Sequence, residues 1–189
     1  FLKMKAVVLA GGKSSRMGQD KALILFNEKP LLLHIANILQ EVNSKVYISG
    51  KKGAYNSFPY PQIADVYPEK GPLGGIYSAL EYCKDDILVC PCDMPFINTY
   101  VLHFLLLNYD STRINVLEFN GQIFPTLGIY PYNVASALKT FIENDILQLQ
   151  KVLTALNAQK IAYPVHPNTK RYFTNLNTPE DLKIQTFSN

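Results

Sequence analysis

A polar stretch near the amino end combines two adjacent glycines with three cations. Gly11 and Gly12 follow an apolar run, and Lys13, Arg16 and Lys21 lie within nine residues of one another. Paired glycines after a buried strand let backbone N–H groups approach a phosphate closely. Guanidinium and ammonium groups beside them would neutralise the charge that builds on a triphosphate. We therefore expect an anion site in this loop, the alternative being a solvated turn with its basic residues facing water.

Two common phosphate-binding patterns do not fit the loop. A P-loop needs a glycine five residues before Gly12, where this chain has Val7. A dinucleotide fingerprint needs glycines at offsets zero, two and five, and Gly11, Gly12 and Gly18 do not supply them. The loop is therefore expected to bind phosphates in another way.

Asp93 is the second residue with clear chemical potential. It comes just after a buried strand at 86–90, where open α/β sheets place their ligands. Mg²⁺ prefers carboxylate and phosphate oxygens, so one aspartate and a triphosphate form a plausible partial shell. A loop-capping aspartate is the alternative. Cys90 and Cys92 are expected to be core thiols, because Cys83 alone cannot complete a four-thiolate site and the histidines lack zinc spacing.

Other candidate positions stand at predicted element ends. Asp65 follows a short strand, and the Gly71-Pro-Leu-Gly-Gly75 segment opens a helix whose N–H groups would bind an anion or a base edge. A plain strand-end carboxylate and a turn before a helix are the alternatives. Asn175 and Asn177 precede another helix start, for which Thr178 is a sufficient cap. His34, His103 and His166 are expected to be structural or solvent-facing.

Strand-like and helical patterns alternate along the chain, which predicts an α/β fold with a covered sheet. The second half adds a hairpin signal at Asn120-Gly121, so we expect an antiparallel excursion on a mainly parallel, mixed sheet in a three-layer, Rossmann-like domain. Strands are expected at 5–9, 45–48, 62–64, 86–90, 114–119 and 123–130, with late ones at 160–164 and 172–174. Helices are expected from Pro30, from the 71–75 loop to 81, at 102–107 after a cap at Asn98 or Thr99, at 134–143 and 147–156, and from Thr178.

Composition narrows the classes of protein. A chain of 189 residues without repeats or linkers predicts one domain, residues 1–189. The net charge of +3 is too small for a general nucleic-acid or membrane surface, and no apolar run approaches the ~18 residues of a membrane span. Charged residues are only 17%, which fits buried elements rather than disorder. Three cysteines, an odd number, suggest reduced thiols and a cytoplasmic location.

The loop from Leu9 to Lys21 resembles the signature loop of nucleotidyltransferases that join a nucleoside triphosphate to a phosphorylated acceptor. Within that group it is most similar to the molybdenum cofactor guanylyltransferases, which attach GMP to molybdopterin. Four further blocks follow in the family's order, so the resemblance covers residues 5 to about 183. These blocks are Gly71-Pro-Leu-Gly-Gly75, Pro91-Cys-Asp-Met-Pro95, Phe124-Pro-Thr126 and Asn175-Leu-Asn-Thr-Pro-Glu-Asp-Leu182.

The resemblance implies roles for individual residues. Arg16, Lys21 and Asp93 would be catalytic, with Asp93 holding Mg²⁺, or Mn²⁺ in its place. Asn175 and Asn177 would lie on the acceptor side. Many relatives have Asn where this chain has Ser49, so guanine selection would rest instead on backbone groups of residues 9–11. The nucleotide contacts implied are Leu9, Ala10, Gly11, Gly12, Lys21, Ser49, Asp65, Gly71, Pro72 and Leu73.

The expected reaction is attack by a terminal phosphate oxygen of molybdopterin on the α-phosphorus of GTP, with pyrophosphate leaving. A phosphate monoester is already anionic at neutral pH, so no general base is required. The resemblance also implies transient contact with proteins that insert molybdenum or receive the cofactor. Two alternatives remain open: a cytidylyltransferase of the same fold, acting on molybdopterin or another phosphorylated acceptor, and a non-catalytic nucleotide-binding regulator.

Overall fold

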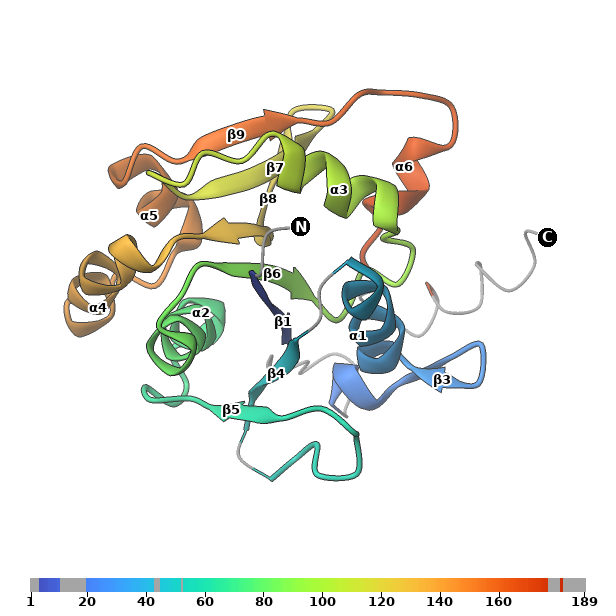
Figure 1. Ribbon diagram of the computed structural model, residues 1–189, viewed down its shortest axis with the longest axis horizontal. Coiled ribbons are helices and arrows are strands. Elements are labelled where there is room, and N and C mark those ends of the chain that lie inside the picture. Colours follow the sequence, from blue (N-terminus) through green and yellow to red (C-terminus); the bar gives the residue numbers. More distant parts are fainter. Residues whose placement is uncertain (1–3, 11–19, 43–44, 52, 177–180, 182–189) are drawn as a thin grey trace.

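The described residues of the protein are organised around a sheet of seven strands in the order β5-β4-β1-β6-β8-β7-β9 (Figure 1). The computed structural model describes residues 4–10, 20–42, 45–51, 53–176 and 181. A separate two-stranded sheet pairs β2 (Leu25–Phe26) with β3 (Lys29–Pro30). The seven strands are β1 (Lys5–Leu9), β4 (Val46–Gly50), β5 (Gln62–Ala64), β6 (Ile87–Pro91), β7 (Asn115–Phe119), β8 (Gln122–Tyr130) and β9 (Gln159–Ala162).

The sheet is mixed and mainly parallel, as predicted. β1 pairs in parallel with β4 on one side and β6 on the other, and β4 pairs in parallel with β5. β8 is antiparallel to both β6 and β7, whereas β9 is parallel to β7. Every strand of the seven-stranded sheet except β8 therefore points the same way. Six carboxyl ends meet at one edge, which we call the carboxyl edge, and the β7–β8 turn joins them there.

Helices cover both faces of the sheet, which confirms the three-layer expectation. Figure 1 shows α1 and α3 on one face and α2, α4 and α5 on the other. The alternation of β1 explains this arrangement, since Val8 packs into the cluster that holds α1 and α3, while Val7 packs into the cluster under α2 and α4. The helices are α1 (Leu31–Val42), α2 (Gly71–Cys83), α3 (Thr99–Leu107), α4 (Ala135–Glu143), α5 (Leu149–Ala155) and α6 (Thr169–Tyr172), with short 3₁₀ turns η1 (Lys21–Leu23) and η2 (Tyr132–Val134).

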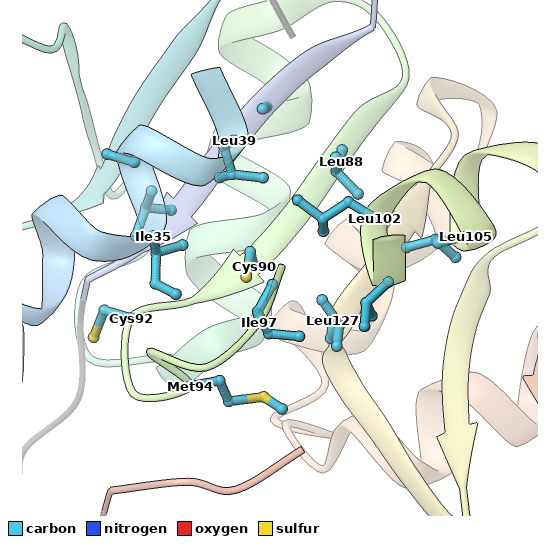
Figure 2. Close-up of a cluster of buried hydrophobic side chains, with 14 of the residues drawn as sticks. Ile35, Leu39, Leu88, Cys90, Cys92, Met94, Ile97, Leu102, Leu105 and Leu127 are labelled. Atoms are coloured by element: carbon cyan, nitrogen blue, oxygen red, sulfur yellow. The ribbon is translucent and has the colours of Figure 1, made fainter. Parts of the chain in front are cut away.

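The core between β6, α1 and α3 fixes the loop that follows β6. In Figure 2, side chains from α1, α3 and β6 converge, and Met94 and Ile97 of the following loop point into the same cluster. Met94 and Ile97 are only 1% and 2% exposed. Full burial of one such side chain contributes about 1.5–3 kcal/mol, so the two anchors hold this loop firmly against the sheet. Asp93 immediately precedes the first of them.

The hairpin between β7 and β8 has the geometry that Asn120-Gly121 predicts. Both residues have positive φ, 51° and 77°, as a type I′ turn requires. The cap of α3 is also confirmed, because the Asn98 side chain accepts a hydrogen bond from the Val101 N–H at 3.1 Å. Most strand and helix bounds lie within one or two residues of expectation. The helix start expected at Thr178 falls outside the described residues.

Two expectations about the elements are corrected by the structure. Tyr172 ends the short helix α6, so the strand expected at 172–174 is wrong. A turn held by Thr169 starts that helix, since the Thr169 hydroxyl donates to the His166 carbonyl and accepts from the His166 N–H. Pro30 was expected to open α1, but it ends β3, and the helix begins at Leu31.

Candidate active site

The carboxyl edge brings together candidate site residues that follow three parallel strands of the sheet. Asp65 follows β5, Asp93 follows β6, and Ala10 follows β1 between them in the sheet. Because these strands are parallel, the residues that follow them share one edge, where open α/β sheets bind ligands. Gly11, Gly12, Lys13 and Arg16 of the signature loop, and Asn177, lie outside the described residues, so their predicted roles stay predictions.

Lys21 and Asp93 meet at this edge. The Lys21 Nζ lies 3.1 Å from the Asp93 Oδ2, and the two side chains are only 19% and 20% exposed. Lys21 opens η1, whose start is fixed by Asp20, because its Oδ1 accepts a hydrogen bond from the Ala22 N–H at 3.0 Å. The structure therefore brings together two of the three residues predicted to be catalytic. Their shared position joins a cation with a carboxylate in a partly desolvated setting.

Backbone hydrogen bonds hold Asp93 in place from two sides. The Cys92 N–H donates to the Leu9 carbonyl at 3.2 Å, which ties the loop after β6 to β1. The Leu176 N–H donates to the Asp93 carbonyl at 2.8 Å, which ties the loop to the block near the carboxyl end. Asn175, next to Leu176, has a buried Oδ1 for which the structure gives no hydrogen-bond partner. The segment that contains Asn175 is thus brought to the Asp93 loop, and the acceptor-side role of Asn175 stays a prediction.

The Asp93 loop and the segment hydrogen-bonded to it carry oxygen groups of the type that binds a hard divalent cation. A carboxylate on Asp93 and an orphaned amide oxygen on Asn175 are oxygen ligands of the type that Mg²⁺ selects. Within the described part of the chain, no group of three or more His, Cys, Asp or Glu side chains is arranged to hold a metal. An ion held here would therefore complete its shell with phosphate and water oxygens, as Mg²⁺ does in nucleotide enzymes.

Asp65 is a second carboxylate with unused hydrogen-bonding capacity. Its Oδ1 is buried and has no hydrogen-bond partner in the structure. Burial raises the pKa of Asp65 above its ordinary value, because desolvation disfavours the charged form. Such an oxygen is costly for the fold unless a ligand donates to it. Asp65 therefore presents an oxygen that a ligand donor would satisfy, and its role as a nucleotide contact stays a prediction.

Gly75 is tightly packed beside Ser49 and Leu9, close to Asp65. A Cβ at this position would lie 3.0 Å from the Ser49 Oγ, 3.3 Å from the Leu9 Cδ2 and 3.8 Å from the Asp65 Oδ1. The Ser49 side chain is itself buried and donates to the Gly75 carbonyl at 3.3 Å. Ser49 thus braces α2 against β4 from within the core, and any nucleotide contact from its hydroxyl would have to share this hydrogen bond.

The backbone at the end of β1 is largely engaged within the chain. Ala10 is buried, its N–H donates to the Ser49 carbonyl at 2.9 Å, and its carbonyl accepts from the Tyr55 hydroxyl at 2.6 Å. Leu9 is also buried, and its carbonyl accepts from Cys92. The Ala10 N–H is therefore committed to the sheet. A carbonyl has a second lone pair, so the acceptors at Leu9 and Ala10 remain usable by a base.

The start of α2 presents backbone donors at the same edge. Lys70 occupies the N-cap position without a side-chain hydrogen bond to the helix, and Pro72 lies in the first turn. Gly71 has a φ of 61°, a conformation that glycine adopts without strain. The first N–H groups of the helix consequently have no side-chain cap, which leaves them for a ligand or water. Leu73 is fully buried and anchors this turn.

A cavity that sequence reasoning missed lies at the other half of the carboxyl edge. It has a volume of about 580 Å³ and is lined by the β7–β8 hairpin, the segment before α6, and α6 itself. Phe119 and Phe173 stack in its wall with ring centroids 4.5 Å apart. Only Phe124, in the Phe124-Pro-Thr126 block, belonged to a recognised motif. The lining residues are Phe119, Asn120, Gln122, Phe124, Val165, His166, Pro167, Lys170, Phe173 and Thr174.

The cysteines and histidines are arranged largely as predicted. Cys83, Cys90 and Cys92 are buried free thiols, and burial is the largest cause that raises the pKa of each. His34 contacts the Phe26 carbonyl through its Nε2 at 2.6 Å. His103 and His166 are exposed, and His166 also lines the cavity. The described helices include none long and apolar enough to cross a membrane.

Comparison with known proteins agrees with this geometry. The sequence pattern of the MobA-like NTP transferase domain matches residues 6–167. A protein of Flavobacterium johnsoniae named probable molybdenum cofactor guanylyltransferase is 32% identical over 177 residues, which cover 93% of this chain and 92% of the relative. The molybdenum cofactor guanylyltransferase of Vibrio campbellii is 33% identical over 181 residues, or 93% and 91% of the two chains.

A solved structure shares the fold. Molybdopterin-guanine dinucleotide biosynthesis protein A from Archaeoglobus fulgidus superposes with a TM-score of 0.79 at 24% identity, covering 96% of each chain. The resemblance drawn from the signature loop and the four later blocks is therefore confirmed. Since the domain pattern spans most of the sequence and relatives exceed 30% identity over nearly all of it, the chain belongs to the MobA-like NTP transferase family of nucleotidyltransferases.

Proposed function

We propose that this protein transfers GMP from GTP to the terminal phosphate of molybdopterin and so forms a molybdopterin guanine dinucleotide. The observation that carries the proposal is the Lys21–Asp93 ion pair at the carboxyl edge, in a loop that is hydrogen-bonded to the segment containing Asn175. The relatives in Flavobacterium johnsoniae and Vibrio campbellii are named as guanylyltransferases of this cofactor, which favours GTP over CTP as the donor.

In this reaction an oxygen of the acceptor phosphate forms a bond to the α-phosphorus of GTP. The bond between that phosphorus and the bridging oxygen breaks, and the electron pair leaves with pyrophosphate. The acceptor phosphate is ionised at neutral pH, so it needs no enzymatic base. The work left for the protein is to align the two substrates and to stabilise charge on the phosphates.

Lys21 supplies part of that charge stabilisation. Its ammonium is held at the edge by the short turn η1 and by Asp93, where it would contact the α-phosphate or the leaving group. Arg16 is proposed to act with it, on the strength of the family resemblance. Asp93 and Asn175 would hold Mg²⁺, or Mn²⁺ in its place, and the bound ion would further neutralise the phosphates.

The rest of the nucleotide is proposed to lie between β1, β5 and the start of α2. The unpartnered Asp65 oxygen would accept a hydrogen bond from a nucleotide N–H or O–H, and this relieves its desolvation cost. The uncapped N–H groups at Gly71 and Leu73 would bind an anionic group.

The acceptor is proposed to occupy the aromatic cavity at the β7–β8 hairpin. Its wall combines the stacked Phe119 and Phe173 with the cation of Lys170, which suits a planar ring that carries a phosphate. Thr174, at the cavity, is joined through Asn175 and Leu176 to the Asp93 loop. This short path would direct the acceptor phosphate from the cavity to the nucleotide.

A pyrophosphate-release assay with molybdopterin tests the proposal. We expect release with GTP and Mg²⁺, little release with CTP, and loss of release on removal of the metal with a chelator. Asp85→Asn is the matched control for Asp93→Asn, because Asp85 also pairs with a lysine, Lys5 at 3.8 Å, at the opposite edge of the sheet. Faster turnover with CTP than with GTP would show that the protein is a cytidylyltransferase. Nucleotide binding without any pyrophosphate release would show that it is a non-catalytic regulator.

A further inference from the structure

The buried phenol of Tyr55 contacts both residues that flank segment 11–19. Its hydroxyl donates to the Ala10 carbonyl at 2.6 Å and to the Asp20 Oδ2 at 2.7 Å. Tyr55 comes from the connection between β4 and β5, outside every motif that the sequence offered, and it is only 1% exposed. A single hydroxyl proton shared by two acceptors holds them close to one oxygen atom.

The ring of Tyr55 is held in one position. A Cβ on Gly50 would lie 2.8 Å from the ring's Cε2, so the ring packs on the backbone at the end of β4 where a side chain would clash. The Tyr55 N–H donates to the Gln62 Oε1 at 3.3 Å, and the ring of Phe58 lies 6.4 Å away. Burial, followed by the hydrogen bond to Asp20, raises the pKa of Tyr55 far above its ordinary value. The hydroxyl therefore keeps its proton and remains a donor.

The contact with Asp20 connects Tyr55 to Lys21, one of the residues proposed to stabilise the phosphates. The other oxygen of Asp20 caps η1 by accepting from the Ala22 N–H at 3.0 Å. Lys21 lies between these two anchors in the chain, and its ammonium meets Asp93. One carboxylate thus fixes the turn that carries the catalytic cation, and Tyr55 orients that carboxylate through the Oδ2.

We propose that Tyr55 is a positioning residue for nucleotide transfer, whose hydroxyl joins Ala10 to Asp20 and, through Asp20, sets the place of Lys21. This inference rests on the proposed function. It assigns no contact between Tyr55 and the substrates. Its effect belongs to the nucleotide half of the site, because Ala10, Asp20 and Lys21 all lie there and the aromatic cavity is built from other segments.

The test uses Tyr55→Phe, which removes the hydroxyl and keeps the ring on Gly50. We expect the KM for GTP to rise about tenfold, the effect of one buried hydrogen bond to a charged group, while the KM for molybdopterin stays within about twofold. The matched control is Tyr60→Phe from the same connection, whose hydroxyl contacts Asn37 and Gln40 on α1. That variant should keep the KM for GTP and the KM for molybdopterin within about twofold of the wild-type values.

A double-mutant cycle shows whether Tyr55 acts through Asp20. Asp20→Asn retains an oxygen for the Ala22 N–H but presents an amide to Tyr55, so it should raise the KM for GTP by a similar factor. The KM for GTP of the double variant should then be no more than about twofold higher than that of either single variant. If Tyr55→Phe fails to fold, Asp20→Asn alone tests the same contact from its other side.

Hydrogen exchange gives a readout without nucleotide. In Tyr55→Phe the amides of Ala10 and Ala22 should exchange faster than in the wild type, while amides in α4 should be unchanged. The inference would be overturned if wild type and Tyr55→Phe had the same KM for GTP. It would also be overturned if Tyr55→Phe lost thermal stability while the KM values for GTP and molybdopterin stayed unchanged. Either result would leave the proposed function intact. A wild-type protein that binds no nucleoside triphosphate would overturn the proposed function and this inference with it.

Discussion

The ammonium of Lys21 lies 3.1 Å from the carboxylate of Asp93, although the two residues are separated by 72 positions in the chain. Each belongs to a loop at the carboxyl end of a different strand, and the pair is held by caps and backbone hydrogen bonds that its own side chains do not supply. A cation and a carboxylate are thus assembled in advance of any substrate. Such preorganisation is the main contribution that a protein makes to phosphoryl-type transfer.

Asp93→Asn should abolish this arrangement while leaving the fold intact. The amide is isosteric but neutral, so it loses both the ion pair with Lys21 and the charge that attracts a divalent ion. We expect kcat for pyrophosphate release to fall by about 100-fold or more, the usual cost of losing a group that stabilises charge in the transition state. Circular dichroism and the melting temperature should stay close to the wild type, as in Asp85→Asn. Turnover within about threefold of wild type would contradict the role given to Asp93.

Asp65→Asn should make the protein more stable and less active. Burial raises the pKa of Asp65, which means that the charged form is disfavoured in the folded state. When the pKa of a carboxyl group is higher in the folded state than in the unfolded state, the group destabilises the folded protein at high pH, where it is ionised. This destabilisation disappears as the pH falls and the carboxyl group is protonated in both states. The melting temperature of Asp65→Asn should therefore exceed that of the wild type at pH 8 by about 2 °C or more, and the difference should shrink towards pH 4.

The same substitution separates stability from binding. An amide oxygen is a weaker acceptor than a carboxylate, so the Kd for GTP should rise about tenfold in Asp65→Asn. Calorimetry at pH 8 measures this constant, and scanning calorimetry from pH 4 to 8 measures the stability. An Asp65→Asn protein that melts below the wild type at pH 8 would show that the carboxylate supports the fold.

Much of this architecture is readable from local sequence. The apolar runs of β1 and β6, the Asn120-Gly121 turn and the Asn98 cap each specify their structure through a few neighbouring residues. Asp93 was identifiable because it follows a buried strand inside a recognisable block. Local patterns give the wrong secondary structure where contacts with other residues outweigh the propensity of a segment. Tyr172 has strand propensity, but the turn closed by Thr169 places it in a short helix.

The features that the sequence did not reveal depend on distant segments. Tyr55 lies in no motif, and its importance appears only when the β4–β5 connection brings it to Ala10 and Asp20. The aromatic cavity joins residues of the β7–β8 hairpin to residues of α6, more than forty positions later in the chain. Neither arrangement has a sequence signature, because each is defined by side chains that only tertiary packing places together.

Asn175→Ala should weaken the response to Mg²⁺ more than the binding of GTP alone. The buried Oδ1 of Asn175 has no partner within the described chain, and a cation held with Asp93 would use it. We expect the Mg²⁺ concentration for half-maximal turnover to rise about 10-fold to 100-fold, in line with losses of supporting groups in metal sites. Asn108→Ala is the control, since its amide donates to the Phe104 carbonyl on the surface of α3. An unchanged Mg²⁺ midpoint would contradict the proposal that the Asn175 oxygen helps to hold the ion.

Lys170→Ala should act on the acceptor alone. Lys170 is exposed at the rim of the aromatic cavity, where its charge would attract the phosphate of the incoming molybdopterin. An exposed charge contributes modestly, so the KM for molybdopterin should rise by about threefold to tenfold and the KM for GTP should not change. The effect should diminish at high salt, because screening weakens attraction at a cavity rim.

Lys151→Ala is the control, because it removes an exposed lysine from α5 and should leave the KM values for molybdopterin and GTP unchanged. If Lys170→Ala instead raised the KM for GTP, the cavity would belong to the nucleotide, and the acceptor would have to approach Asp93 from another side.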